Sequence, residues 1–172
     1  MSAPPLTLAD LNRMNRTGFA TTLGFAFELS PWVVQRAYDA APFDSVEALH
    51  AATMAVLEAA PEAERLALIR AHPELASKAA IDKTLTAESN AEQASAGLDK
   101  LTPEEFERFH ALNAAYRERF GFPFVACVRD HGGAGLEELL AARAGAAPDD
   151  ELRTALHEVS AIARHRLEDL CA

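Results

Sequence analysis

Two short polar segments, His72-Pro73-Glu74 and Ser89-Asn90-Ala91-Glu92-Gln93, interrupt a sequence that is otherwise rich in alanine and leucine. The second segment adds a hydroxyl, a carboxylate and an amide 17 to 21 residues after the imidazole of His72. Histidine changes its charge near neutral pH without any perturbation, which suits it to general acid–base catalysis. The two segments therefore indicate proton-transfer chemistry on a small substrate.

His72 also has a purely structural interpretation. It ends a helical stripe that Arg65, Leu68 and Ile69 begin, and Pro73 disfavours helical conformation in the residue before it. We therefore expect His72 at a helix end, where its ring would need no more than a carbonyl partner. The pattern alone leaves both interpretations open.

The second segment has a structural alternative as well. Ser89 and Glu92 have the spacing of a capping box, in which the serine caps the helix start and the glutamate reaches back to its N–H. The same helix start would attract an anionic ligand group, with Glu92 and Gln93 projecting toward it. The cap does not need Gln93, so Gln93 favours a binding role.

A third candidate is Arg166, on a long helix predicted from about Asp149 to Leu170. Helical spacing gives this helix an apolar stripe of Leu152, Leu156, Val159, Ala163, Arg166 and Leu170, with Glu158 among the residues of the polar side. A buried guanidinium must be paired, because an isolated buried charge costs several kcal/mol or more. A salt bridge, a head group reaching solvent and a bound anionic ligand all satisfy this requirement.

The elements that must position these residues are predicted to be helices almost throughout. Capping patterns predict helix starts at Thr7, Ser30-Pro31, Asp44, Pro61 and Ser89, and a helix from Thr102-Pro103 to Phe120 that Gly121 ends. An apolar, extended stretch follows at 122–128, then a glycine turn at 132–135 and a short helix through Arg143. We expect an all-α, single-domain bundle of about eight to nine helices over residues 1–172.

Composition excludes several classes of function. The net charge of -10 argues against binding to nucleic acid or anionic membranes. No stretch is apolar enough to span a membrane, residues 1–5 do not begin a secretion signal, and Cys127 and Cys171 lack the spacing of a zinc site or a disulfide framework. We expect a cytoplasmic protein without a metal.

The chain resembles the 2-oxo-4-hydroxy-4-carboxy-5-ureidoimidazoline (OHCU) decarboxylases, which complete the conversion of urate to (S)-allantoin. The resemblance covers nearly the whole length, and its order and spacing are more specific than any one motif. It is carried by Leu23–Glu28, Ser30–Val33, Ala41–Phe43, Leu68–Ala76, Ser89–Gln93, Tyr116 with Arg119–Val125, and Ile162–Leu167.

This resemblance implies an all-helical, cofactor-free homodimer that acts on a small anionic ureidoimidazoline. It places the catalytic histidine at His72, the second acid–base residue at Glu92 and the substrate-binding arginine at Arg166. The remaining substrate-binding positions that it implies are Pro73, Ser89, Asn90, Ala91 and Gln93, together with the backbone of Phe124, Val125, Ala126, Cys127 and Val128.

Two other classes of function stay open at this point. A noncatalytic helical module that binds a partner protein would explain the helices but not His72, Gln93 and Arg166 together. A hydrolase of a related ureide would use His72 to activate water. Within the decarboxylase hypothesis, the sequence does not determine whether His72 or Glu92 delivers the final proton.

Overall fold

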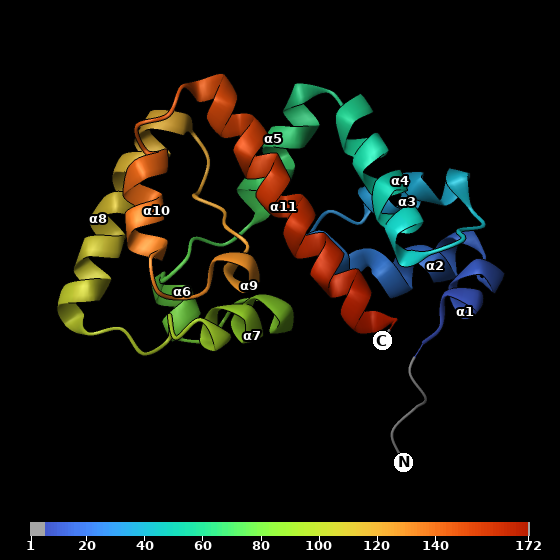
Figure 1. Cartoon of the computed structure of the whole chain (residues 1–172), viewed down its shortest axis with the longest axis horizontal. Coiled ribbons are helices and arrows are strands. Elements are labelled where there is room, and N and C mark those ends of the chain that lie inside the picture. The colour runs from blue at the N-terminus through green and yellow to red at the C-terminus, as the bar shows by residue number, and fades with distance from the viewer. Residues whose placement is uncertain (1–5, 172) are drawn as a thin grey trace, which may run out of the picture. The chain divides into compact units, whose positions relative to one another are not determined.

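The structure, a computed structural model, describes residues 6–171. Residues 1–5, from which we expected no secretion signal, lie outside the described residues. Within residues 6–171 it contains eleven α-helices, nine of them longer than four residues, two 3₁₀ helices and no β-strand (Figure 1). None of these helices is both long and apolar enough to cross a membrane. The prediction of an all-α protein is confirmed.

The described chain divides into two compact units, which are considered separately. The first comprises the described residues up to Ala71 together with those from Ser160 onward. Its helices are α1 (Leu8–Arg13), α2 (Arg16–Leu23), η1 (Gly24–Ala26), α3 (Trp32–Ala37), η2 (Tyr38–Ala40), α4 (Val46–Ala59), α5 (Glu62–Ala71) and the C-terminal part of α11 (Pro148–Leu170). The second unit is His72–Val159, with α6 (Lys78–Ile81), α7 (Ala87–Ser95), α8 (Pro103–Phe120), α9 (Val128–His131), α10 (Leu136–Arg143) and the rest of α11.

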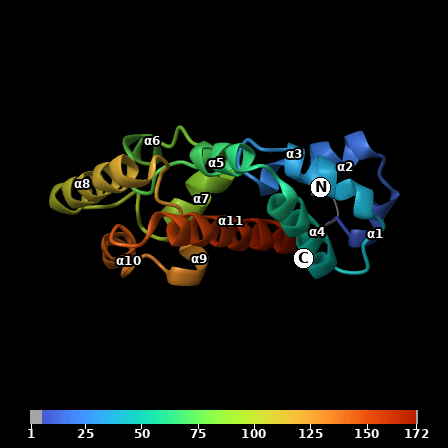
Figure 2. The same cartoon turned by 90° about the horizontal axis from the view of Figure 1, so that it is seen from above.

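In the first unit, α3 packs against both α2 and α4 (Figure 2). Phe19 lies at the centre of this packing, with its ring 5.3 Å from that of Tyr38 and 5.9 Å from that of Phe43. Asn12 fixes the loop before α4, because its side chain binds both the N–H and the carbonyl of Phe43 at 2.8 Å. Ring packing and this amide bridge together hold the N-terminal helices to the loop that follows them.

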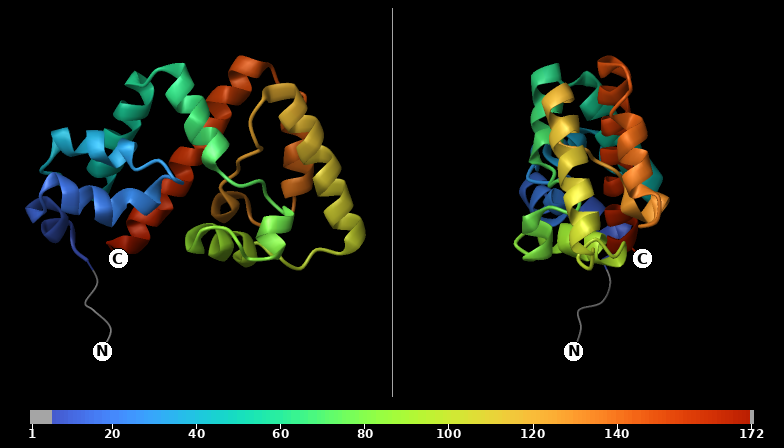
Figure 3. Two further views of the ribbon diagram at one scale, coloured as in Figure 1. Left: turned by 180° about the vertical axis from the view of Figure 1, so that it is seen from behind. Right: turned by 90° about the vertical axis from the view of Figure 1, so that its left-hand side faces the viewer.

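In the second unit, α8 and α10 lie side by side (Figure 3). The ring of Tyr116 on α8 contacts those of Phe120, Phe122 and Phe124, with centroids 4.6 to 6.0 Å apart. The start and end of α8 agree with the prediction: Thr102 and Glu105 form a capping box, and Gly121 ends the helix at φ 75°.

Several details of the predicted elements are wrong. The N-cap of α3 is Pro31 rather than Ser30, and no side chain caps that helix. The N-cap of α4 is Ser45 rather than Asp44, because the Ser45 hydroxyl accepts the N–H of Ala48 at 3.0 Å. The stretch 122–128 is buried as expected, but Val128 already belongs to α9. That short helix begins where the carbonyl of Cys127 accepts the N–H groups of Asp130 and His131.

His50 on α4 gives the first unit a pH-dependent stability. Its Nε2 lies 3.0 Å from both the carbonyl and the hydroxyl of Ser160. Burial lowers the pKa of His50 below its ordinary value of 6.5, so the folded state binds this proton less readily than the unfolded state does. The free energy of unfolding should therefore fall as the pH drops below about 6.5.

We expect His50→Gln to flatten this acid-side decline in chemical denaturation measured from pH 7 to pH 5. His110→Gln, at an exposed position on α8, is the control and should keep the parent's slope. An unchanged slope in the His50 variant would assign the acid sensitivity to other groups.

Candidate active site

His72 occupies the position that the sequence predicts, directly after the last residue of α5. Its side chain is buried, with 6% of its surface exposed, and Pro73 follows it into a loop that ends at α6. A buried imidazole at a helix end is shielded from bulk water, a setting in which electrostatic interactions are stronger.

The loop after His72 is held by side chains from two helices. Gln93 on α7 accepts the N–H of Ala76 at 3.0 Å and donates to the carbonyl of Glu74 at 3.3 Å. Asn113 on α8 donates to the carbonyl of Leu75 at 2.9 Å. Ala76 has a φ of 54°, in the left-handed region that non-glycine residues seldom adopt. These three hydrogen bonds fix the conformation of the loop and tie α7 to the chain that leaves His72.

The helix that carries the second polar segment begins earlier than predicted. Thr86 is the N-cap of α7, and its hydroxyl accepts the N–H of Ser89 at 3.3 Å, so the predicted capping box of Ser89 and Glu92 is wrong. Two hydroxyl residues three positions apart compete for this role, and Thr86 has the extended ψ of 156° that an N-cap needs. The start of α7 therefore does not need the Glu92 carboxylate, and the capping explanation for that residue is removed.

The backbone of the segment 124–128 is buried and bound by charged side chains. The carbonyl of Val125 accepts a hydrogen bond from Arg143 Nη1 at 2.8 Å, and the N–H of Cys127 donates to Glu158 Oε2 at 2.7 Å. Burial raises the pKa of the Cys127 thiol to about 11, so this thiol stays protonated at neutral pH. Cys127 contributes its backbone here, not a reactive sulfur.

Arg166 is buried as predicted and lies in the first unit. Its Nη1 donates to the carbonyl of Phe25 at 3.0 Å and to Glu28 Oε2 at 3.1 Å. Arg166 and Glu28 are each 4% exposed. Among the alternatives drawn from the sequence, the structure contains the salt bridge.

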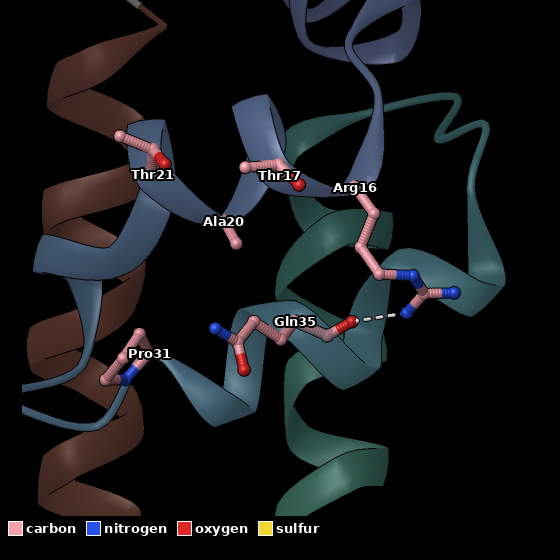
Figure 4. A pocket seen from close by; sticks show the side chains of 6 residues that line it. All are labelled: Arg16, Thr17, Ala20, Thr21, Pro31 and Gln35. Carbon is pink, nitrogen blue, oxygen red and sulfur yellow. Dashed lines mark hydrogen bonds between the residues drawn. The ribbon is translucent and has the colours of Figure 1, made fainter.

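A surface pocket of about 320 Å³ lies elsewhere in the first unit, between α2 and α3 (Figure 4). Its lining residues are Arg16, Thr17, Ala20, Thr21, Pro31 and Gln35. The Arg16 guanidinium points across it to the carbonyl of Gln35 at 2.8 Å and also pairs with Asp39. None of the residues predicted for the site lines this pocket.

The family model described as OHCU decarboxylase matches residues 12–168. The chain belongs to the OHCU decarboxylase family. It is therefore a decarboxylase, a carboxy-lyase, as the resemblance implied.

Individual relatives in the OHCU decarboxylase family agree with the match. The 2-oxo-4-hydroxy-4-carboxy-5-ureidoimidazoline decarboxylase of Haloferax volcanii is 42% identical over 95% of both chains. The enzyme of the same name from Halalkalicoccus jeotgali is 39% identical over 96% of this chain and 92% of its own. A crystal structure of (S)-allantoin synthase matches 95% of this chain with 29% identity and a TM-score of 0.76, and the chain spans 54% of that protein's length.

Within this member of the OHCU decarboxylase family, the second unit contains His72, Pro73, the Ser89–Gln93 segment and the Phe124–Val128 segment, whereas Arg166 belongs to the first. Ser89 and Gln93 are buried, Pro73, Asn90 and Glu92 are partly exposed, and Ala91 is exposed. Asn90 donates to the carbonyls of Lys83 and Leu85 at 3.1 and 3.0 Å.

Two buried carboxylates on α11, Glu151 and Glu158, were not predicted from the sequence. Glu158, placed on the polar side, is buried because it binds Cys127 N–H and His131, and Glu151 is buried against Arg143 and Tyr116. Leu152, Leu156 and Leu170 are only partly buried, so the buried stripe is rotated from the predicted one. A detectable signal was present, because Glu151 and Glu158 are seven residues apart and share a face with Ala155 and Ile162.

Proposed function

We propose that this protein decarboxylates 2-oxo-4-hydroxy-4-carboxy-5-ureidoimidazoline to (S)-allantoin without a cofactor, as a step of urate degradation. The observation that carries the proposal is the buried imidazole of His72, at the head of a loop that Gln93 fixes, in a chain whose relatives named for this reaction match 95% of its length. The (S)-allantoin synthase structure, matched over part of its own chain, supports the same product.

The chemistry fits the side chains available. In this substrate the bond to the carboxyl group lies beside a ring carbon–nitrogen double bond. As carbon dioxide leaves, the electron pair of the broken bond moves toward that double bond. One proton must then reach the ring carbon of the double bond from one face, and this sets the (S) configuration. The substrate supplies its own electron sink, so the protein has to provide position, charge and the proton.

We assign proton transfer to His72 and Glu92. In support of this, Gln93, the neighbour of Glu92 on α7, hydrogen-bonds the loop that follows His72. The Ser89 amide already donates to Thr86, so we assign substrate binding to the buried hydroxyl of Ser89 instead. One N–H of the Gln93 amide donates to Glu74, and an amide nitrogen carries two, so the second is assigned to the ureido oxygen.

The rest of the proposed site follows the resemblance. Arg166 is assigned to the substrate's negative charge, as the resemblance implies, and its guanidinium also holds Phe25 and Glu28. Pro73, Asn90 and Ala91 are assigned to the pocket wall, and the backbone of Phe124–Val128 to the ring amides. The homodimer, the cytoplasmic location and the single domain over residues 1–172 stay predictions.

The product distinguishes this function from the alternatives. Urate is oxidised and ring-opened by upstream enzymes, the protein is added, and allantoin is followed by circular dichroism. We expect (S)-allantoin to form faster than in the spontaneous reaction and as a single enantiomer. Racemic allantoin at the spontaneous rate would contradict the proposal, and release of ammonia or urea would indicate a hydrolase.

A further inference from the structure

Buried charged side chains bind the backbone of the segment before α9 at Val125 and at Cys127, two residues apart. Arg143 on α10 donates through Nη1 to the carbonyl of Val125, and its guanidinium lies 4.6 Å from the ring centre of Phe124. Its Nε and Nη2 bind Glu151 Oε1 at 2.8 and 2.5 Å, and the Tyr116 hydroxyl donates to the same oxygen. The carbonyl of Val125 is therefore fixed by a guanidinium that is itself fixed by a buried carboxylate.

Glu158 on α11 provides the second anchor. Its Oε2 accepts the N–H of Cys127 at 2.7 Å, and its Oε1 lies 2.8 Å from Nε2 of His131. Glu158 is only 7% exposed. A buried carboxylate is tolerated when each oxygen has a donor, and here one donor is the backbone of the segment and the other is a side chain of α9.

The two anchors determine which backbone groups remain available. In an extended chain, residues two apart point their N–H and carbonyl groups to the same side, and the residue between them points its groups to the other. The Val125 carbonyl and the Cys127 N–H bind Arg143 and Glu158, and Cys127 has extended dihedral angles, with φ -74° and ψ 96°. The same alternation assigns the N–H and carbonyl of Ala126 to the opposite side, where the proposed function needs them for the ring amides.

We propose that Glu158 is a positioning residue for the decarboxylation: by holding the Cys127 N–H, it turns the backbone of Ala126 toward the substrate. This inference rests on the proposed function. Glu158 acts on binding through the backbone and takes no part in proton transfer, so its loss should raise KM and spare kcat.

The test compares Glu158→Leu with Glu158→Gln. The leucine variant leaves the buried Cys127 N–H without an acceptor, and we expect KM for the ureidoimidazoline to rise about tenfold or more, with kcat within about threefold of the parent. The glutamine variant keeps an acceptor oxygen and should restore KM to near the parent value. If the leucine variant does not fold, Glu158→Asp takes its place, because the shorter carboxylate cannot reach Cys127 and His131 together.

Two controls separate this role from general destabilisation. His131→Gln keeps an N–H donor for Glu158 Oε1 while it removes the imidazole, and should leave KM near the parent value. Asn12→Ala removes two long-range hydrogen bonds in the first unit and should lower stability without raising KM. A rise in KM in either control would overturn the inference.

A readout independent of turnover separates failure of this inference from failure of the proposed function. Amide hydrogen exchange at Cys127, measured by NMR, should be slow in the parent and in Glu158→Gln and faster in Glu158→Leu or Glu158→Asp. Faster exchange with unchanged KM would overturn the positioning role, as would unchanged exchange. A parent that shows slow exchange but makes no (S)-allantoin would instead contradict the proposed function.

Discussion

Replacing His72 by asparagine should lower kcat by about 100- to 10,000-fold, the contribution that a positioned general acid or base makes. Asparagine is similar in size and can hydrogen-bond, but it cannot exchange a proton near neutral pH. The loop after His72 is held by Gln93 and Asn113, so the fold should persist without the imidazole. The measurement is the initial rate of (S)-allantoin formation, with thermal unfolding followed in parallel.

His110→Asn is the matched control, because it makes the same exchange at an exposed position on α8. It should have the parent's kcat and unfolding midpoint. A His72→Asn variant that is folded and keeps kcat within about tenfold of the parent would remove His72 from the proton-transfer step and leave Glu92 as the remaining candidate.

The parts of the fold that the sequence predicted best are those with local chemical signals. The helix from Pro103 to Phe120 was predicted because a capping box begins it and a glycine with positive φ ends it, and both signals depend on a few neighbouring residues. Where two residues could each be the N-cap, as Thr86 and Ser89 could at α7, the choice depends on the conformation of the chain before the helix. Tertiary packing sets that conformation, and the spacing of residues alone does not reveal it.

The candidate site likewise has features that local sequence signals predicted and features that depend on distant residues. His72 at the end of α5 and the burial of Arg166 follow from periodicity and from the proline that comes next. The partners of these residues do not, because Glu28 is 138 positions from Arg166 and Glu158 is 31 from Cys127. A carboxylate on a helix is normally assigned to solvent, and only its distant donors make burial tolerable.

Arg166→Met tests whether the buried arginine serves the fold alone. Removing one partner of a buried ion pair leaves the other charge uncompensated, so Glu28 should make this variant about 3–5 kcal/mol less stable. Loss of a charged hydrogen bond to the substrate should at the same time raise KM about 10- to 100-fold. The single variant therefore mixes two effects, which denaturant unfolding and steady-state kinetics measure separately.

The double variant Glu28→Gln/Arg166→Met separates these effects. Neutralising Glu28 removes the unpaired charge, so the free energy of unfolding should recover toward the parent value. Stability repair cannot return a guanidinium to the substrate, and KM should stay as high as in Arg166→Met. Glu28→Gln alone is the matched control and keeps the arginine, so its KM should be close to the parent's. If KM recovers together with stability in the double variant, Arg166 is only the structural partner of Glu28, and the negative charge of the substrate must be bound by another residue.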